Sequence, residues 1–362
     1  MSEKTAVIHD WLNGMRGGEK VLEEILKIFP QADVFTLFLE SKKISEAIRQ
    51  HRIFTSSLNR FSWVRRHYPF FIPLFPGSVE EFNLQDYRLV LSSSHCVAKG
   101  IVPAPDATHI GYIHSPMRYA WDQYYPYFGR YRGMRKVFIG RQMSRLRTWD
   151  VASSARVDHF VANSAYVQKR IEKFYRREAA VIHPPVDTDF FRPAMRPSRD
   201  YYLLVSALVP YKQVGVLVNA FNRLGSRLVI VGRGVEEGRL RRQARKNIDF
   251  AGWVTPDRLR ELYQNARALV FSGVEDFGIF FGEALACGTP IVAYGRGGVR
   301  DIAEEGKTGI FFAEQTPESL INALKIFEKS DFDSEEIRRG SLRFSPEHFR
   351  RKFRTFIEER TR

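Results

Sequence analysis

The sequence predicts an α/β protein with two doubly wound parallel sheets, and three observations support this. Short runs rich in valine and isoleucine recur along the chain, and segments with helical spacing of apolar residues separate them, as in parallel βαβ units. The pattern occurs once on each side of a proline-rich stretch. The length of 362 residues also suits two domains better than one.

Six strands are expected in each half of the chain. In the first half they are residues 5–9, 34–37, 89–92, 109–113, 159–162 and 180–182. In the second half they are residues 202–206, 227–231, 248–251, 268–271, 290–294 and 310–312. Because such sheets bind ligands beyond the carboxyl ends of their strands, we expect two Rossmann-like domains that face each other across a deep cleft.

Prolines set the expected domain boundary. Four of them lie between residues 184 and 197, where neither a helix nor a central strand would accept them. We therefore expect an amino-terminal domain over 1–187, a linker over 188–200 and a carboxyl-terminal domain over 201–345. Residues 346–362 carry phenylalanines at helical spacing, which predicts a final helix that could pack back on the amino-terminal domain.

Charge is the most unusual feature of the composition. The chain has 56 lysine and arginine residues against 41 acidic ones, a formal net charge of +15, which attracts polyanions such as nucleic acid, anionic membranes or phosphorylated substrates. Basic and aromatic residues interleave over 51–82 and 124–149, as in surfaces that insert aromatic groups among anionic lipid headgroups. The alternative is a solvated basic face beside a proline-bent core segment.

The cysteines and the lack of long apolar segments indicate a protein of a reducing compartment. Cys96 and Cys287 are far apart among apolar neighbours and are expected to be reduced core thiols. The first residues lack the long apolar stretch of a secretory signal, and no later segment is apolar for long enough to cross a bilayer. We expect a cytoplasmic protein, which could attach peripherally to the cytoplasmic face of the membrane.

Three loops after expected strands carry glycine, lysine or carboxylates. Gly17 and Gly18 precede a helix whose first amides would favour an anion. Lys212 lies near another helix start, where a cation suits a diphosphate. Gly278 allows a bent backbone, and Glu283, expected to start a helix, could accept hydrogen bonds from hydroxyl groups. The simpler alternatives are a tight turn at Gly17 and Gly18, a surface lysine at Lys212 and a helix cap at Glu283.

Read together, these residues resemble a known family. Residues 275–290 and the pair 297–298 are similar to the donor-site signature of glycosyltransferase family 4, retaining enzymes of GT-B fold. Residues 16–19 are similar to the family's amino-terminal glycine loop, and Lys212 stands at its phosphate-binding lysine. Residues 114–122 resemble a stretch of bacterial mannosyltransferases that assemble O-antigen and exopolysaccharide. The resemblance covers nearly the whole chain.

The resemblance implies an activity. It implies transfer of a hexose, with mannose from GDP-mannose as the expected donor, to a lipid-linked or oligosaccharide acceptor in lipopolysaccharide or other surface polysaccharide assembly. The expected partners are that nucleotide-sugar donor, the acceptor and an anionic membrane surface. No cofactor or metal is expected, because the sequence has no Asp-x-Asp pair on a strand-end loop, and Asp187 and Asp189 are interpreted as turn residues.

The resemblance also implies roles for individual residues. Glu275 would lie near the transferred sugar, Lys212 would bind the phosphates, and His114 would face the reacting centre as a hydroxyl-binding or core histidine. The residues implied in substrate binding are Gly17 and Gly18 under the diphosphate, Phe277, Gly278 and Ile279 through backbone amides, and Glu283 at the ribose.

One position departs from the family pattern. Ala207 stands where family members usually have an arginine that neutralises the donor diphosphate. The loss of such a contact would cost a few kcal/mol of transition-state stabilisation, about the scale of one oxyanion donor. Arg233 could compensate as a substrate-binding residue, as could Arg296 or Arg300. An inactive variant is the other outcome.

Two other classes of function remain open from the sequence. A nucleotide-sugar epimerase or hydrolase of the same fold would need no lipid acceptor. A basic nucleic-acid-binding protein would use the +15 charge, but the arginine-rich segment precedes no recognisable reading helix, so no nucleic acid is expected.

Overall fold

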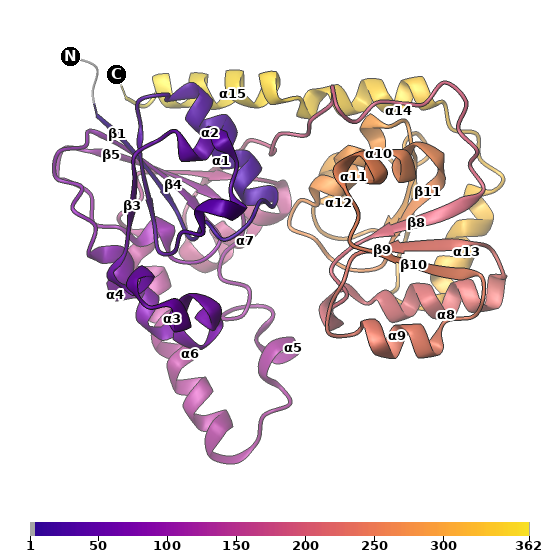
Figure 1. Ribbon diagram of the computed structural model, residues 1–362, viewed down its shortest axis with the longest axis horizontal. Coiled ribbons are helices and arrows are strands. Elements are labelled where there is room, and N and C mark those ends of the chain that lie inside the picture. The colour runs from indigo at the N-terminus through magenta and orange to yellow at the C-terminus, as the bar shows by residue number, and fades with distance from the viewer. Residues whose placement is uncertain (1–3, 362) are drawn as a thin grey trace. The chain divides into compact units, whose positions relative to one another are not determined.

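The computed structural model describes residues 4–361 and contains two compact units (Figure 1). Unit 1 contains the chain up to Pro185 and again from Phe349, and unit 2 is Val186–His348. The chain therefore enters unit 2 once and returns to unit 1 for its last residues.

Unit 1 is built on a parallel sheet that has seven strands within the described residues, in the order β3-β2-β1-β4-β5-β6-β7. The strands are β1 (Thr5–His9), β2 (Asp33–Thr36), β3 (Ile53–Thr55), β4 (Leu89–Ser94), β5 (Thr108–Ile113), β6 (His159–Ala162) and β7 (Ala179–Val181). All six expected strands are present. The additional edge strand β3 is only three residues long and half-buried, so its pattern was too short to predict it.

The helices of unit 1 follow from local apolar spacing. They are α1 (Gly17–Ile28), α2 (Glu46–Arg49), α3 (Ser62–Arg66), α4 (Phe75–Glu80), α5 (Tyr124–Phe128), α6 (Gly133–Ser154) and α7 (Ala165–Tyr175). In α1, Val21, Leu22 and Ile25 share one face and are buried against the sheet. The amino-terminal half of α6 is different, since its first buried residue is Met143.

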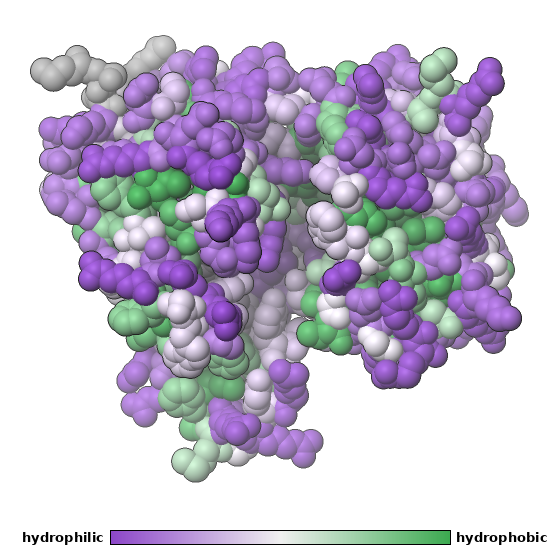
Figure 2. Space-filling view, viewed as in Figure 1, coloured by the Kyte–Doolittle hydropathy of each residue, from purple (hydrophilic) through white to green (hydrophobic). Residues whose placement is uncertain are grey.

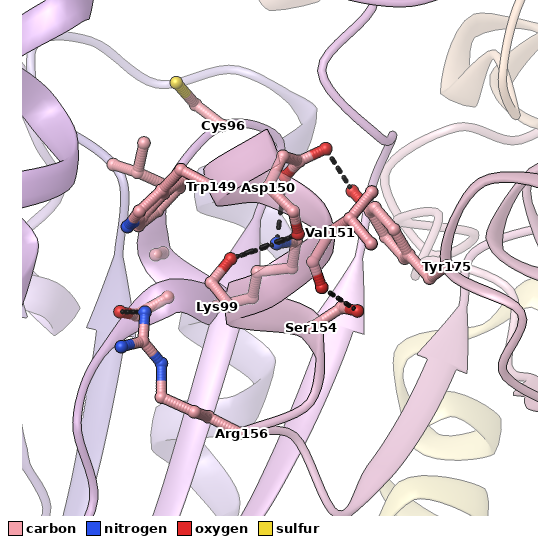
Figure 3. A network of polar contacts seen from close by, with 12 residues as sticks. Cys96, Lys99, Trp149, Asp150, Val151, Ser154, Arg156 and Tyr175 are labelled. Atoms are coloured by element: carbon pink, nitrogen blue, oxygen red, sulfur yellow. Dashed lines mark hydrogen bonds and ion pairs between the residues drawn. The ribbon is translucent and has the colours of Figure 1, made fainter. Parts of the chain in front are cut away.

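A buried ion pair anchors the carboxyl-terminal half of α6 (Figure 3). The Lys99 ammonium lies 2.9 Å from the Asp150 carboxylate and also donates to the Ser153 hydroxyl at 2.8 Å. The hydroxyl of Tyr175 and the indole N–H of Trp121 donate to the other carboxylate oxygen at 3.0 and 2.8 Å. Because both charges are hydrogen-bonded as well as paired, the desolvation cost of burying them is offset.

Unit 2 repeats the architecture with a parallel sheet in the order β10-β9-β8-β11-β12-β13. Its strands are β8 (Tyr201–Val205), β9 (Leu228–Val231), β10 (Ile248–Gly252), β11 (Ala266–Phe271), β12 (Ile291–Tyr294) and β13 (Gly309–Phe312). Its helices are α8 (Val214–Leu224), α9 (Glu237–Gln243), α10 (Pro256–Asn265), α11 (Ile279–Ala286), α12 (Val299–Ile302), α13 (Pro317–Phe327) and α14 (Ser334–Ser341). Each strand expected in this half is present.

Residues 188–200, expected to be a linker, pack onto unit 2. Phe191 is buried in the core of this unit, and the Arg338 guanidinium donates to the carbonyl oxygens of Thr188 and Phe191 at 3.2 and 3.1 Å. The prolines exclude regular structure here, but apolar side chains between them still reach the core. The boundary of the compact unit therefore falls at Val186.

The last helix, α15 (Pro346–Glu358), carries its phenylalanines into unit 1. Phe349 and Phe353 lie with ring centroids 5.9 and 6.0 Å from that of Tyr112 on β5. Arg350 pairs with Glu24 of α1. None of the helices in the described part of the chain combines the length and apolar character needed to span a bilayer.

Candidate active site

The strand order of both sheets reverses at one point. In unit 1 the reversal lies between β1 and β4, and in unit 2 between β8 and β11. Sheets of this type bind ligands beyond the carboxyl ends of the strands that flank such a switch point. The loops after these four strands are therefore the place to look for a site in each unit.

Lys212 lies at the unit 2 switch point, just after β8. It belongs to the short helix η5 (Pro210–Lys212), is 5% exposed, and its ammonium pairs with the Glu275 carboxylate in the loop after β11. The hydroxyl of Ser272 donates to the carbonyl of Gln213 at 2.8 Å, which ties the two loops together. Two of the three residues expected to be catalytic are thus in direct contact.

Glycine allows the loop after β11 to pack closely. The Gly298 N–H donates to the Glu275 carbonyl at 2.8 Å, and a Cβ at residue 298 would lie only 2.4 Å from the Asp276 carbonyl oxygen. Gly278 has φ +87°, a conformation that other residues rarely adopt, and α11 begins directly after it at Ile279. The first amides of a helix have no partners within it and are oriented to bind an anion.

The side chain of Phe277 has a packing role. It is 2% exposed and meets Phe344 edge to face with ring centroids 5.7 Å apart. Only the backbone of Phe277 is therefore suited to the ligand contact expected of it, whereas Ile279 is half-buried at the first position of α11.

Glu283 lies inside α11, four residues after its start, and not at the helix start as expected from the sequence. The reason is that Gly278 turns the chain into the helix earlier. Glu283 is buried and accepts a hydrogen bond from the Tyr263 hydroxyl at 3.0 Å. Burial, followed by the nearby Glu283 charge, raises the pKa of Tyr263 well above its usual range, so Tyr263 remains a donor to this carboxylate.

Arg233 lies on a loop that contacts the loop of Ala207. Both Arg233 and Ala207 are exposed, and the Leu208 N–H donates to the Arg233 carbonyl at 3.0 Å. Arg300, in contrast, donates from its Nε to the Gly295 carbonyl at 2.9 Å, and its guanidinium approaches Glu305 at 3.8 Å. The backbone of Arg233 thus bonds directly to the loop that carries Ala207.

Three histidines gather at the unit 1 switch point. The Ser93 hydroxyl at the end of β4 is 3.0 Å from His9 Nδ1 and 2.8 Å from His114 Nε2. The ring centroids of His9, His95 and His114 lie 6.2 to 6.4 Å from one another. His114, expected to face the reacting centre, is therefore part of a polar cluster formed by the ends of β1, β4 and β5.

Gly17 and Gly18 bring the start of α1 to this cluster. A Cβ at Gly18 would lie 3.3 Å from Cε1 of His9 and 3.7 Å from Nε2 of His114. Glu19 caps the same helix by accepting from the Arg16 N–H at 3.0 Å and lies 3.9 Å from His9. Burial alone would raise the pKa of Glu19, but His9 and the backbone contact outweigh it and lower that pKa to about 2.

Asp10 organises the loop after β4. Its two carboxylate oxygens accept from four successive backbone N–H groups, those of residues 95–98, at 2.6 to 2.9 Å. His95 Nδ1 lies 3.0 Å from the same carboxylate. Burial opposes ionisation, but the charge and hydrogen bonds of His95 dominate and hold the pKa of Asp10 well below its usual range. Asp10 is therefore a structural anion.

His114 is neutral at physiological pH. Burial, followed by repulsion from His9 and His95, lowers the pKa of His114 to about 3. A neutral imidazole can exchange hydrogen bonds with a hydroxyl group but supplies no positive charge. Asn163, at the end of β6, donates to the His114 carbonyl at 2.9 Å and so holds its backbone in place.

Sequence reasoning missed several members of the unit 1 cluster, namely His9, Asp10, Ser93 and His95. Their signal was present, since polar residues directly follow the apolar runs of β1 and β4. Two residues of the mannosyltransferase-like stretch instead have partners inside unit 1: the Trp121 indole bonds to Asp150, and the Asp122 carboxylate pairs with Arg170 at 2.5 Å.

Comparison with known proteins agrees with this geometry. A family model described as Glycosyltransferase Family 4 matches residues 15–190, and one described as Glycosyl transferases group 1 matches residues 185–341. A GDP-mannose-dependent alpha-(1-6)-phosphatidylinositol monomannoside mannosyltransferase of Mycobacterium tuberculosis is 31% identical over 194 residues, 44% of this chain and 50% of that relative. A D-inositol 3-phosphate glycosyltransferase of Acidothermus cellulolyticus is 31% identical over 208 residues, 48% of this chain and 46% of that relative.

The fold is also that of solved glycosyltransferase structures. An Anabaena protein crystallised with UDP and glucose superimposes with a TM-score of 0.70 at 15% identity, covering 98% of this chain and 99% of that one. The chain spans about half the length of the two curated relatives it matches. Two Rossmann-like units, a glycine-bounded Lys212–Glu275 pair and consecutive family matches over residues 15–341 lead to one conclusion: this chain belongs to glycosyltransferase family 4.

Proposed function

We propose that the protein is a retaining glycosyltransferase that moves a hexose from a nucleoside diphosphate sugar to an acceptor hydroxyl. The contact between Lys212 and Glu275 at the unit 2 switch point carries this proposal. It joins a cation suited to phosphate with a carboxylate suited to sugar hydroxyls, beside the amino terminus of α11.

In the proposed reaction, stabilising the leaving group matters more than forming a covalent intermediate with the enzyme. As the bond from the sugar to the diphosphate breaks, negative charge grows on the phosphate oxygens. Lys212 and the first amides of α11 would stabilise that charge from fixed positions, and electrostatic stabilisation of this kind usually contributes most to the rate enhancement of an enzyme. Glu275 would orient the sugar through its hydroxyl groups while the acceptor oxygen attacks on the face that the nucleotide leaves and gives its proton to the departing phosphate.

In this proposal the unit 1 cluster binds neutral groups. His114 is held by Ser93 at 2.8 Å and stays neutral, so it would hydrogen-bond a hydroxyl of the sugar or acceptor. Gly18 leaves space above His9 and His114 for such a group. A role for His114 as nucleophile is not part of the proposal.

We propose mannose from GDP-mannose as the donor and a reaction that needs no metal. Two likenesses favour mannose: the Mycobacterium tuberculosis relative is a GDP-mannose-dependent mannosyltransferase, and residues 114–122 resemble a stretch of mannosyltransferases. The Anabaena structure holds UDP and glucose, so UDP-sugars belong in the same panel of candidates.

We propose that the acceptor is lipid-linked and is presented at an anionic membrane, as in surface polysaccharide assembly. The amino-terminal half of α6, before its first buried residue Met143, supports this. Met134, Val137 and Phe138 have helical spacing there and are 90%, 72% and 64% exposed. The neighbouring Arg135 and Lys136 are exposed as well. Hydrophobic and hydrophilic residues are interspersed over the α3 and α6 region of unit 1 (Figure 2). A helix with this pattern places apolar groups among headgroups while its cations bind lipid phosphates.

A binding and transfer experiment tests the proposal. The thermal stability of the purified chain is measured with GDP, UDP, ADP, GDP-mannose and UDP-glucose, because a ligand that binds only the folded state raises the melting temperature. Radiolabelled transfer from the stabilising sugar nucleotide is then measured with and without membranes, and with and without EDTA.

Three results are informative. Label transferred to membrane lipid in EDTA supports the whole proposal. Release of free or epimerised sugar without membranes would instead indicate a hydrolase or epimerase. A chain that no nucleotide stabilises would refute the donor site.

A further inference from the structure

A basic pocket of about 770 Å³ opens in unit 1 beside the loop that joins β1 to α1. Its lining comes from that loop, from residues 39–43 after β2, which include the short helix η1 (Ser41–Lys43), from α3 and from Tyr68. Cations dominate its lining, namely Arg16, Lys42, Lys43, Arg65 and Arg66.

Most of this positive charge is uncompensated. Among the described lining residues the one carboxylate is Glu40, which pairs with Lys43 at 2.7 Å. Arg65 donates to the carbonyl of Asn59. Within the described residues Arg16, Lys42 and Arg66 have no carboxylate partner, and three like charges around one pocket repel unless an anion enters.

One residue of the pocket lining also has an unused hydrogen-bond acceptor. Asn13 lines the pocket, and its side-chain carbonyl oxygen is buried with no hydrogen-bond partner among the described residues. Buried polar atoms are rarely left unpaired, so a ligand hydroxyl near the anionic group would satisfy it. The preferred ligand therefore carries both an anion and a hydroxyl.

The helix α3 links the pocket to an apolar surface. Ser62, Arg65 and Arg66 have the spacing of one helical face and line the pocket. Trp63 in the same helix is 64% exposed, and Phe61 before it is 59% exposed. The six residues 61–66 thus offer cations to an anionic group and aromatic side chains to an apolar one, which suits an amphiphile better than a free ion.

We propose that this pocket binds the phosphate or diphosphate group of a lipid-linked sugar acceptor, with its apolar chain along the surface formed by Phe61 and Trp63. The inference rests on the proposed function, because it identifies the acceptor of that reaction. It differs from the donor site, whose phosphate ligands are Lys212 and the start of α11 in unit 2.

Binding to vesicles tests the proposal without any transfer reaction. Phosphatidylcholine vesicles with a polyprenyl phosphate are compared with vesicles that carry phosphatidylglycerol, and inorganic pyrophosphate is added as a soluble competitor. The variant is Lys42→Gln with Arg66→Gln. The control is Lys169→Gln with Lys173→Gln, two exposed lysines of α7 whose removal lowers the net charge equally.

We expect the pocket variant to bind polyprenyl phosphate vesicles about a hundredfold more weakly, since two charge-assisted hydrogen bonds are lost and each is worth about tenfold. The control variant should bind like the wild type, and both should keep the melting shift with nucleotides. If both variants bind the vesicles equally weakly, binding depends on overall positive charge, and the pocket proposal is wrong. If the protein binds pyrophosphate tightly and shows no preference for polyprenyl phosphate, the ligand of the pocket is not a lipid-linked phosphate.

Failure of the two proposals can be told apart. If the wild type binds polyprenyl phosphate through Lys42 and Arg66 but no nucleotide stabilises it, the donor proposal fails and the pocket stands. If nucleotides stabilise all variants and vesicle binding does not depend on the pocket, the pocket proposal fails alone.

Discussion

The two switch points have the same topology but different chemistry. In unit 2 the loops bring together one buried ion pair, Lys212 and Glu275, beside a helix start reached through Gly278. In unit 1 the loops bring histidines together around Ser93, whose hydroxyl bonds to His9 and His114, and His114 is kept neutral. The fold places a site at both positions, and the side chains decide whether it suits an anion or hydroxyl groups.

The largest test of this difference is removal of the cation. Lys212→Gln should lower kcat/KM for sugar transfer by roughly 10²- to 10³-fold, because one donor to the leaving group is lost. Steady-state kinetics with the donor identified by thermal shift would measure it. Lys246→Gln, an exposed lysine of unit 2, is the control for net charge and should change little. Similar activity in both variants would remove Lys212 from the chemistry.

A second test concerns stability and belongs to unit 1. Asp10→Asn should lower the free energy of unfolding by about 2 to 3 kcal/mol, since an amide cannot accept all four N–H groups that the carboxylate accepts. Urea denaturation would measure it, with the exposed Asp86→Asn as control. The nucleotide-induced melting shift should persist, because the donor loops are in unit 2. Loss of that shift in folded protein would contradict the separation of the two sites.

A third test uses pH. The pKa of His114 is lowered to about 3 in the folded protein, so the unfolded chain takes up this proton first, and stability is lost as pH falls from about 6.5 towards 3. The loss from His114 should reach about 2 kcal/mol by pH 5, at about 1.4 kcal/mol per pH unit. Denaturation of wild type and His114→Asn at pH 7.5 and 5 would measure it. The difference in free energy of unfolding between the two proteins should shrink at the lower pH. Equal losses of stability in both proteins would argue against a neutral His114.

The smallest expected effect comes from Ala207→Arg. Restoring the family arginine should improve the donor KM or kcat by less than about tenfold, because one additional partly exposed charge is worth about 1 kcal/mol. Donor titrations in the presence and absence of Arg233→Gln would measure it. If Ala207→Arg has no effect until Arg233 is replaced, Arg233 already neutralises the diphosphate. If it has no effect in either background, this loop does not contact the phosphates.

Most of the sheet architecture was readable from sequence because buried parallel strands need continuous apolar runs. Twelve of the strands follow from that pattern, whereas β3 is a half-buried edge strand of three residues and leaves no such run. The start of α11 was misplaced because its first turn depends on the backbone of Gly278, which no apolar spacing reveals. The prolines predict a linker over 188–200 because they exclude regular structure. They do not exclude packing, and Phe191 in this stretch is buried in the core of unit 2.

By itself the sequence determined where twelve of the strands lie and that Lys212, Gly278 and Glu283 follow strands, because apolar runs and turn residues are local signals. Only the tertiary structure decided which polar groups meet. His9, Ser93 and His114 are up to 105 residues apart and become neighbours only because β1, β4 and β5 pair in parallel. The basic pocket has the same origin, since three separate crossovers bring its cations to one place. Such convergence depends on strand order, which no local pattern encodes.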